Sequence, residues 1–455
     1  MRRYLIIGSG AAGISAIEAI RSQDAQGEIV LVAEDRFGYY SRPGLAYLLS
    51  KEIPESLLFP FTDQDFERLQ VRRVHQRAMN VLAESHQVEL SDGTKIPYDR
   101  LLLATGSRAV RMSVPGIELN GSVKLDDLGD AQGILILARR GKKAVVVGGG
   151  ITALEIVEGL AARGVRVHYF LREDRYWGNV LDESESRIIE ERLKEEGIQL
   201  HYHTEMDEVL GKNGRVIGVR TKQNEFISCD IVAVAIGVRP RIELATTCGL
   251  KTDRGILIDE YMQSSVPDIF AAGDIGQVLD PHTGKAMLDT LWSLARNQGK
   301  YAGLNMSGLK SVFTKPVSYN VTRLAGLTTT IIGSVGSGGR DADLVGIARG
   351  DSESWRDATV AGDKRLISAQ SDFVVNRLRL IVGEIKLVGA LLMGDQTLSK
   401  LLQKLVAEEA DISPIRDRIL KPDRPLSEII TEYYGQWQDQ HAAKIASNTT
   451  SRSKS

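Results

Sequence analysis

Near its N-terminus the chain reads Tyr4-Leu5-Ile6-Ile7-Gly8-Ser9-Gly10-Ala11-Ala12-Gly13, an apolar run followed at once by three spaced glycines. The pattern predicts a buried strand that ends at Ile7 and a helix that begins within the glycines. In such a turn Gly8 permits the tight bend, Gly10 lets the backbone approach a pyrophosphate, and Gly13 allows helix to pack closely on strand. The phosphates would lie against N–H groups at the positive end of the helix dipole. The stretch therefore predicts a dinucleotide-binding unit.

An acidic residue in the expected place supports this interpretation. A second apolar run, Ile29 to Val32, leads to Glu34, which lies 21 residues after Gly13. At the end of the second strand of a dinucleotide unit, an acidic side chain hydrogen-bonds the ribose. The plainer alternative is an ordinary strand–turn–helix with a surface glutamate.

The opening pattern returns 140 residues later, counted from Gly8 to Gly148. Residues 142–147 predict a strand, Gly148-Gly149-Gly150 a turn that leads into a helix, and 165–171 the next strand. Two matches in the same strand–helix–strand frame are harder to obtain by chance than one. The sequence thus predicts two dinucleotide-binding units.

Three further apolar runs, at 100–106, 231–237 and 267–274, end on small or acidic residues. Small residues at the carboxyl end of a strand leave room for a ligand. Asp289-Thr290 is expected to cap a helix that continues through Gln298. Beyond Val317 the segments alternate and are interrupted by glycines, which indicates a separate α+β domain on an antiparallel sheet.

Composition excludes several classes of protein. The 455 residues suffice for two or three domains, and 57 basic against 59 acidic residues give a net charge of −2, which argues against a general nucleic-acid binder. No apolar run approaches the roughly 18 residues of a spanning helix. We also expect no signal peptide, because Met1-Arg2-Arg3 leads directly into the first predicted strand and no small-residue cleavage site follows. Two cysteines, Cys229 and Cys248, are too few for a disulfide scaffold. We expect a cytoplasmic protein. The seven histidines show no metal-ligand spacing.

In the order and combination of these motifs, the chain resembles the FAD-dependent pyridine nucleotide–disulfide oxidoreductase superfamily over roughly residues 1–400. Within it, the chain is most similar to ferredoxin and rubredoxin reductases and to the flavin module of NAD(P)H-dependent nitrite reductases. The resemblance implies an α/β fold with two Rossmann-like domains and a C-terminal α+β interface domain. It implies an FAD domain at 1–115 and 240–316, an NAD(P)H domain at 116–239, an interface domain at 317–440, and a polar, disordered tail at 441–455.

The resemblance also implies roles for single residues. FAD binding falls to the glycine turn, the first acid, an Arg-Pro loop, an Ala-Thr-Gly motif and a Gly-Asp pair: Gly8, Gly10, Ala11, Gly13, Glu34, Arg42, Pro43, Ala104, Thr105, Gly106, Gly273 and Asp274. Gly148 and Gly150 would bind the NAD(P)H pyrophosphate, and we add Gly237 to the cofactor-binding residues. Glu155 would lie near nicotinamide and flavin, and Trp292, with Gln298 and Gly299, near the isoalloxazine.

Each of these residues has a plainer interpretation. Thr105-Gly106 could be an ordinary turn, Asp274 a helix cap, Glu155 a solvated helix residue, and Trp292 part of the hydrophobic core. Their combination in the family's order is what favours the functional interpretation.

The chain departs from the family pattern in the loop after the first acid. Disulfide reductases have two cysteines there and related oxidases have one, whereas residues 39–50 contain none. Disulfide reduction and cysteine-sulfenate chemistry are therefore not expected, and Cys229 and Cys248 are expected to be bystanders. Many ferredoxin reductases have a lysine where this chain has Tyr47, which weakens assignment to that subgroup.

The second unit also lacks the usual strand-end acid, because Leu171 stands in its place and Arg172 follows. A guanidinium there could pair with the 2′-phosphate of NADPH. Glu173 and Asp174 could repel that phosphate or bind Arg172 themselves, which leaves a solvated strand-end arginine as the alternative. We predict that NADPH is used at least as well as NADH.

The expected reaction is hydride transfer from NADH or NADPH to flavin N5, followed by electron transfer to a ferredoxin, a rubredoxin or a partner reductase. Two other classes remain as alternatives. One is a redox-responsive flavoprotein that regulates a binding partner. The other is a membrane-surface quinone reductase, ranked last because the candidate anchor at 398–409 has mixed charge. A homo-oligomer is left open.

Overall fold

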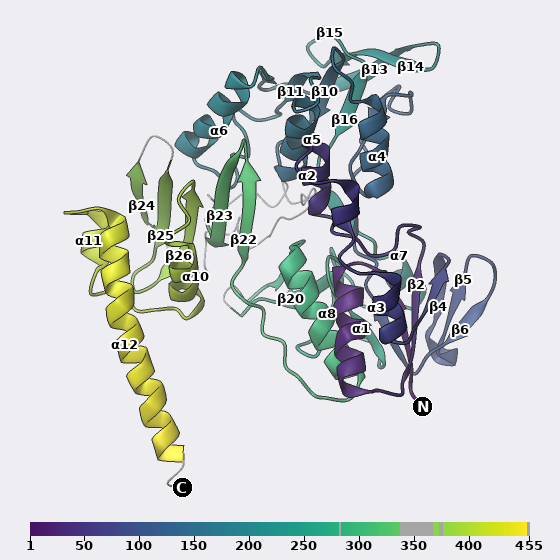
Figure 1. Cartoon of the computed structure of the whole chain (residues 1–455), viewed down its shortest axis with the longest axis vertical. Helices are drawn as coiled ribbons and strands as arrows, with labels where there is room; N and C mark the ends of the chain where they lie inside the picture. The colour runs from purple at the N-terminus through teal and green to yellow at the C-terminus, as the bar shows by residue number, and fades with distance from the viewer. Residues whose placement is uncertain (282–283, 337–366, 373–375, 453–455) are drawn as a thin grey trace. The chain divides into compact units, whose positions relative to one another are not determined.

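The computed structural model describes residues 1–281, 284–336, 367–372 and 376–452, with side chains for all of these except 367–372 and 442–452 (Figure 1). The chain divides into two compact units. The described residues of the first unit are Met1–Gly178 and Ser186–Lys315, apart from 282–283. Those of the second are Asn179–Glu185, 316–336, 367–372 and 376–452.

The first unit contains a five-stranded parallel sheet that begins with the N-terminal apolar run. Its order is β19-β7-β1-β2-β3. The strands are β1 (Arg3–Ile7), β2 (Glu28–Ala33), β3 (Val71–His75), β7 (Arg100–Leu103) and β19 (Ile269–Ala271). The central strands are buried on both faces, as expected for a parallel sheet covered by helices. Helices α1 (Ala11–Gln23) and α8 (Trp292–Met306) lie side by side (Figure 1).

A second five-stranded parallel sheet of the same unit has the order β12-β11-β10-β16-β9. Its strands are β9 (Ser122–Val123), β10 (Lys143–Val147), β11 (Arg166–Phe170), β12 (Gln199–His201) and β16 (Ile231–Val234). The main helices of this stretch are α4 (Leu128–Leu137), α5 (Ile151–Ala161) and α6 (Glu183–Glu195). The predicted α/β class with two Rossmann-like sheets is confirmed.

Shorter elements surround the two sheets. The helices are α2 (Gly44–Leu49), α3 (Asp63–Arg68) and α7 (Glu243–Thr247), and the antiparallel sheets include β4-β5-β6, β13-β14-β15 and the pair β8 (Ser107–Ala109) with β17 (Val238–Pro240). The remaining bounds are β4 (Ala78–Leu82), β5 (Gln87–Leu90), β6 (Lys95–Pro97), β13 (Met206–Lys212), β14 (Arg215–Thr221), β15 (Phe226–Ser228), β18 (Ile256–Leu257), β20 (Gly276–Leu279) and β21 (Ala286–Met287).

The second unit is built on an antiparallel sheet of order β22-β23-β26-β25-β24. Its strands are β22 (Tyr319–Leu324), β23 (Leu327–Gly333), β24 (Ile367–Asp372), β25 (Arg377–Val382) and β26 (Leu387–Met393). Helices α10 (Ser399–Ala407), α11 (Arg416–Leu420) and α12 (Leu426–Arg452) follow. Their apolar side chains form one core with the sheet, including Leu380, Leu402 and Ile430.

The structure differs from the sequence-based expectation at the C-terminus. Helix α12 continues to Arg452, so most of the segment expected to be disordered is helical, and residues 453–455 lie outside the described part. Ile429, Ile430 and Tyr433 anchor the first turns in the core, and a helix adds residues more readily than it nucleates. Across the described residues, no helix combines the length and apolar character needed to cross a membrane.

Candidate cofactor site

The first glycine turn is packed tightly on one side and open on the other. Gly8 has a φ of +113°, and a Cβ atom there would lie 2.2 Å from the carbonyl oxygen of Ala104. A Cβ atom at Gly13 would lie 2.1 Å from the carbonyl oxygen of Gly8. At Gly10, in contrast, a Cβ atom would have no neighbour within 4 Å, and no side chain caps the helix that begins there. The turn thus presents uncapped N–H groups to open space, which fits a pyrophosphate.

The Ala-Thr-Gly motif follows β7, the strand beside β1 in the sheet. The N–H of Ala104 donates to the carbonyl of Ile7 at 2.8 Å. Gly106 has a φ of +68° and open space around its Cβ position. The chain then enters β8, which pairs with β17 directly after Gly237, whose φ is +116°. The motif therefore lies where the chain crosses between the two sheets.

The Gly-Asp pair lies after β19 and is held by two hydrogen bonds. The N–H of Gly273 donates to Gln298 Oε1 at 2.7 Å. Ser107 Oγ donates to Asp274 Oδ2 at 2.6 Å, which links the pair to the Ala-Thr-Gly segment. Asp274 therefore lies beside the first residue of β8.

Helix α8 packs backbone to backbone against α1. A Cβ atom at Gly299 would lie 2.1 Å from the carbonyl oxygen of Ala12, so this contact requires glycine. Trp292 begins the helix and is 40% exposed, with the Arg296 guanidinium 5.1 Å from its ring centre. Trp292 is therefore not a core residue.

The prediction that Asp289-Thr290 caps helix α8 is wrong. Leu291 is the N-cap residue, and its apolar side chain makes no cap hydrogen bond. Asp289 is instead buried, and its Oδ2 atom lies 2.9 Å from Lys315 Nζ, which also lies 3.2 Å from Asp280 Oδ2. A buried carboxylate requires a partner, and here the partner lies 26 residues along the chain.

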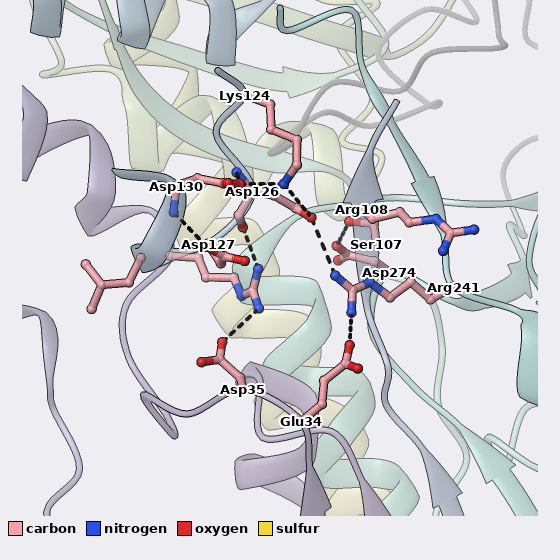
Figure 2. Close-up of polar contacts among 12 residues, drawn as sticks. Glu34, Asp35, Ser107, Arg108, Lys124, Asp126, Asp127, Asp130, Arg241 and Asp274 are labelled. Carbon is pink, nitrogen blue, oxygen red and sulfur yellow. Dashed lines mark hydrogen bonds and ion pairs between the residues drawn. The ribbon is translucent and has the colours of Figure 1, made fainter. Parts of the chain in front are cut away.

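A charged network joins the strand-end acid to the rest of the site. Figure 2 shows Arg241 between Glu34 and Asp126. Arg241 Nη1 donates to Glu34 Oε1 at 2.9 Å, and Arg241 Nη2 lies 3.5 Å from Asp126 Oδ2. Arg42 Nη1 donates to the backbone carbonyl of Asp126 at 2.7 Å. Asp126 thus contacts both arginines.

The network continues into the first turn of α4. Lys124 Nζ lies 2.5 Å from Asp130 Oδ2 and 3.9 Å from Asp126 Oδ2 (Figure 2). Burial raises the pKa of Asp130, and the hydrogen bond from Lys124 opposes that shift. Asp127 Oδ1 accepts from the N–H of Asp130 and caps the helix. The segment 124–130 therefore forms one charged wall of the site.

The second glycine turn is built in the same way. Gly148 has a φ of +143°, and a Cβ atom there would lie 2.2 Å from the carbonyl oxygen of Ala235. Gly150 is the N-cap residue of α5 and no side chain caps that helix. Glu155 lies one turn into the same helix and is half-buried. This turn also fits a phosphate group.

The end of β11 differs from the end of β2. Leu171 is buried, whereas the Arg172 side chain is 64% exposed and its Nε donates to Glu173 Oε1 at 2.9 Å. Arg175 Nη1 lies 3.1 Å from Asp174 Oδ1. Arg172, the candidate for a 2′-phosphate, and the nearby Arg175 are thus each paired with the acid beside them.

The sequence missed Arg241, Asp126 and Lys124. Part of the signal for Arg241 is in the sequence, because the residue directly follows Val238-Arg239-Pro240, which ends a predicted strand. Its pairing with Glu34 is not, because the two residues lie 207 positions apart. The roles assigned to the other site residues, including Glu155 and Trp292, stay predictions. Among the residues the structure describes, no group of three or more His, Cys, Asp or Glu side chains is arranged to hold a metal ion.

Comparisons with known proteins agree with this geometry. Residues 2–299 match the family described as pyridine nucleotide-disulphide oxidoreductase. Rhodocoxin reductase of Rhodococcus erythropolis is 33% identical over 350 residues, which are 73% of this chain and 81% of that protein. Rubredoxin-NAD(+) reductase of Ectopseudomonas oleovorans is 26% identical and covers 84% of this chain and 99% of its own. The solved ferredoxin reductase of the CYP199A2 system from Rhodopseudomonas palustris has a TM-score of 0.82 at 22% identity, covering 95% of this chain and all of that one.

Proposed function

Because the chain belongs to the pyridine nucleotide-disulphide oxidoreductase family and is therefore an oxidoreductase, we propose that it uses FAD to pass electrons from NADH or NADPH to a small redox protein. The observation that carries this proposal is the pair of uncapped glycine turns within one compact unit. When bound, NAD(P)H supplies a hydride and FAD accepts it at N5 and releases electrons one at a time. The acceptor is a ferredoxin, a rubredoxin or a partner reductase of the nitrite-reductase type.

The residues of the first turn fit FAD. Gly10 and Gly106 leave open space beside backbone N–H groups, and Glu34 follows β2 where a ribose acid belongs. Asp274, oriented by Ser107, would accept a hydrogen bond from the ribityl chain. Arg42 would balance the pyrophosphate charge. In the second turn, Gly148 and Gly150 would bind the NAD(P)H pyrophosphate.

Two features would orient the reacting rings. The N-cap residue of α8, Leu291, makes no side-chain cap hydrogen bond, and the positive dipole end of this helix could stabilise negative charge at the flavin N1–C2=O edge. The contact between Gly299 and Ala12 fixes this helix against α1. Trp292 and Glu155 would flank the rings from α8 and α5. These residues bind and orient, so no side-chain nucleophile is required.

The cysteines give no support to thiol chemistry. Burial raises the pKa of the Cys229 thiol to about 12, and burial also raises the pKa of Cys248. A neutral, buried thiol is a poor nucleophile at physiological pH. Both cysteines are free, and residues 39–50 contain none. We therefore propose that electrons leave the flavin directly for the acceptor.

The relatives support a protein acceptor. The names of rhodocoxin reductase and rubredoxin-NAD(+) reductase each include a small redox protein. Nitrite reductase [NAD(P)H] of Bacillus subtilis is 28% identical over 90% of this chain, but the match spans only 48% of that protein. A partner reductase on a separate chain is therefore included among the acceptors.

The test is purification followed by an acceptor screen. We expect a yellow protein that releases FAD on denaturation, is bleached anaerobically by NADH or NADPH, and reduces ferredoxin or rubredoxin faster than quinone or oxygen. A Cys229→Ser, Cys248→Ser double variant should retain its rate. A colourless protein that FAD cannot reconstitute would overturn the proposal. Faster turnover with quinone would show that quinone, and not a small redox protein, is the acceptor.

A further inference from the structure

Arg241 lies where the chain returns from the second sheet to the first. Its N–H donates to the carbonyl of Gly106 at 2.9 Å. Its own carbonyl accepts from Thr105 Oγ1 at 2.8 Å. The backbone of Arg241 is therefore fixed on both sides to the Ala-Thr-Gly motif.

The guanidinium of Arg241 binds two carboxylates. Nη1 donates to Glu34 Oε1 at 2.9 Å, and Nη2 lies 3.5 Å from the carboxylate of Asp126, whose side chain is only 4% exposed. Glu34 is 49% exposed, and its other oxygen, Oε2, lies 3.7 Å from Arg77 Nε. Without Arg241 only this longer contact would restrain Glu34, and a glutamate that is half exposed samples several rotamers. Arg241 thus fixes one oxygen and leaves the carboxylate accessible.

The third guanidinium nitrogen of Arg241, Nε, makes no hydrogen bond with either carboxylate. Its Nε atom is buried and has no hydrogen-bond partner among the described residues. A ligand could not reach an atom with so little exposed surface. The contacts that the structure shows for Nη1 and Nη2 are with Glu34 and Asp126, so we argue the effect of Arg241 on a ligand through those carboxylates.

We propose that Arg241 is a positioning residue for the adenosine half of FAD, holding the carboxylate of Glu34 in place for the ribose hydroxyls. This inference rests on the proposed function, since it requires FAD in the first unit. It assigns a role in cofactor binding to the strand that returns from the NAD(P)H unit. A purely structural role would instead tie that strand to the first sheet and act equally with and without FAD.

The two roles differ in what an alanine substitution changes. The pair with Glu34 is half exposed, and the buried Asp126 keeps Lys124 Nζ at 3.9 Å, so Arg241→Ala should lower the melting temperature of the FAD-free protein by only a few degrees. Loss of the positioned carboxylate should weaken FAD binding about tenfold, the range of one hydrogen bond to a charged group. Arg239→Ala is the matched control, because Arg239 is an exposed arginine on the adjoining strand β17.

The decisive measurement is a double-mutant cycle with Glu34. FAD affinity of the full-length, FAD-stripped protein is measured by flavin fluorescence for wild type, Arg241→Ala, Glu34→Gln and the double variant. If Arg241 acts through Glu34, the double variant binds FAD no more weakly than Glu34→Gln alone. Arg241→Lys keeps the charge without the planar fork and should weaken binding less.

The results of these measurements separate failure of this inference from failure of the proposed function. Unchanged affinity in Arg241→Ala, or effects that add in the double variant, would overturn the inference while wild-type FAD binding upholds the proposed function. Wild-type protein that binds no FAD would instead overturn the proposed function. If Arg241→Ala fails to fold, the same cycle is run with Arg241→Lys, where additivity again contradicts the inference.

Discussion

The two glycine turns of the larger unit differ in how closely the helix approaches the strand. In the first, the position at the third glycine has no space for a side chain, because a Cβ atom at Gly13 would lie 2.1 Å from the carbonyl of Gly8. In the second, Ala153 occupies that position, and its Cβ lies 3.1 Å from the place of a Cβ at Gly148. The second turn therefore has room for a methyl group where the first turn has none.

The turns also differ at the end of the following strand. The first unit has Glu34, held by Arg241 on one side and approached by Arg77 on the other. The second has the buried Leu171 and then Arg172, paired with Glu173. The two glycine turns share their geometry, and we propose that the strand end distinguishes one nucleotide from another. Three sets of variants test the differences between the two units, in order of decreasing expected effect.

The largest effect is expected at Gly10. Its φ of −79° suits any residue and its Cβ position is empty, so Gly10→Val should fold normally. The valine would occupy the space for the pyrophosphate, and flavin content should fall to background, as measured by absorbance of the purified protein. Gly13→Val, which creates a backbone clash, should instead lower the melting temperature or prevent folding.

The same substitution in the second turn, Gly150→Val, distinguishes which nucleotide each turn binds. Gly150→Val should retain FAD but lose reduction by NADH and NADPH, while dithionite still bleaches the flavin. FAD retained in Gly10→Val, or lost in Gly150→Val, would show that the two turns have been assigned to the wrong nucleotides.

An intermediate effect is expected at Arg172. Arg172→Ala should lower kcat/KM for NADPH about fivefold and leave NADH unchanged, because an exposed charge pair contributes about 1 kcal/mol. Glu173→Gln should release Arg172 and shift the ratio toward NADPH. Arg166→Ala, at the exposed start of the same strand, is the control. Equal loss for both donors in Arg172→Ala would contradict a role at the 2′ position.

The smallest effect concerns pH. His168 Nδ1 lies 3.1 Å from His201 Nε2 across β11 and β12, whereas the matching strands β2 and β3 contain no histidine pair. Burial lowers the pKa of both rings, and Lys143 and Arg166 lower that of His168 further while Glu225 raises both. Because the unfolded chain then binds more protons, the free energy of unfolding should fall as pH drops below about 6.5.

Urea unfolding between about pH 7.5 and 5.5 measures this slope. A His168→Gln, His201→Gln double variant should reduce it, and His75→Gln, which changes an exposed histidine, should not. An unchanged slope in the double variant would show that other groups dominate the titration.

The sequence was sufficient where the signal is local. Gly8 to Gly13 and Gly148 to Ala153 carry the turn chemistry within a few residues, so the two parallel sheets could be predicted. The salt bridge between Arg241 and Glu34 joins residues 207 positions apart, and periodicity says nothing about such pairs. Asp289 shows the opposite error, because a local cap motif was outweighed by the distant Lys315. The sequence predicts the strand that carries a residue better than the partner of its side chain.

The place of β19 in the first sheet has a consequence for biosynthesis. β19 lies beside β7, although every strand of the second sheet lies between them in the chain. As the polypeptide leaves the ribosome, the second sheet can close while β7 still presents an unpaired edge, the kind of surface that pairs wrongly with other chains. Chaperone dependence should therefore be greatest for nascent chains that end between β16 and β19.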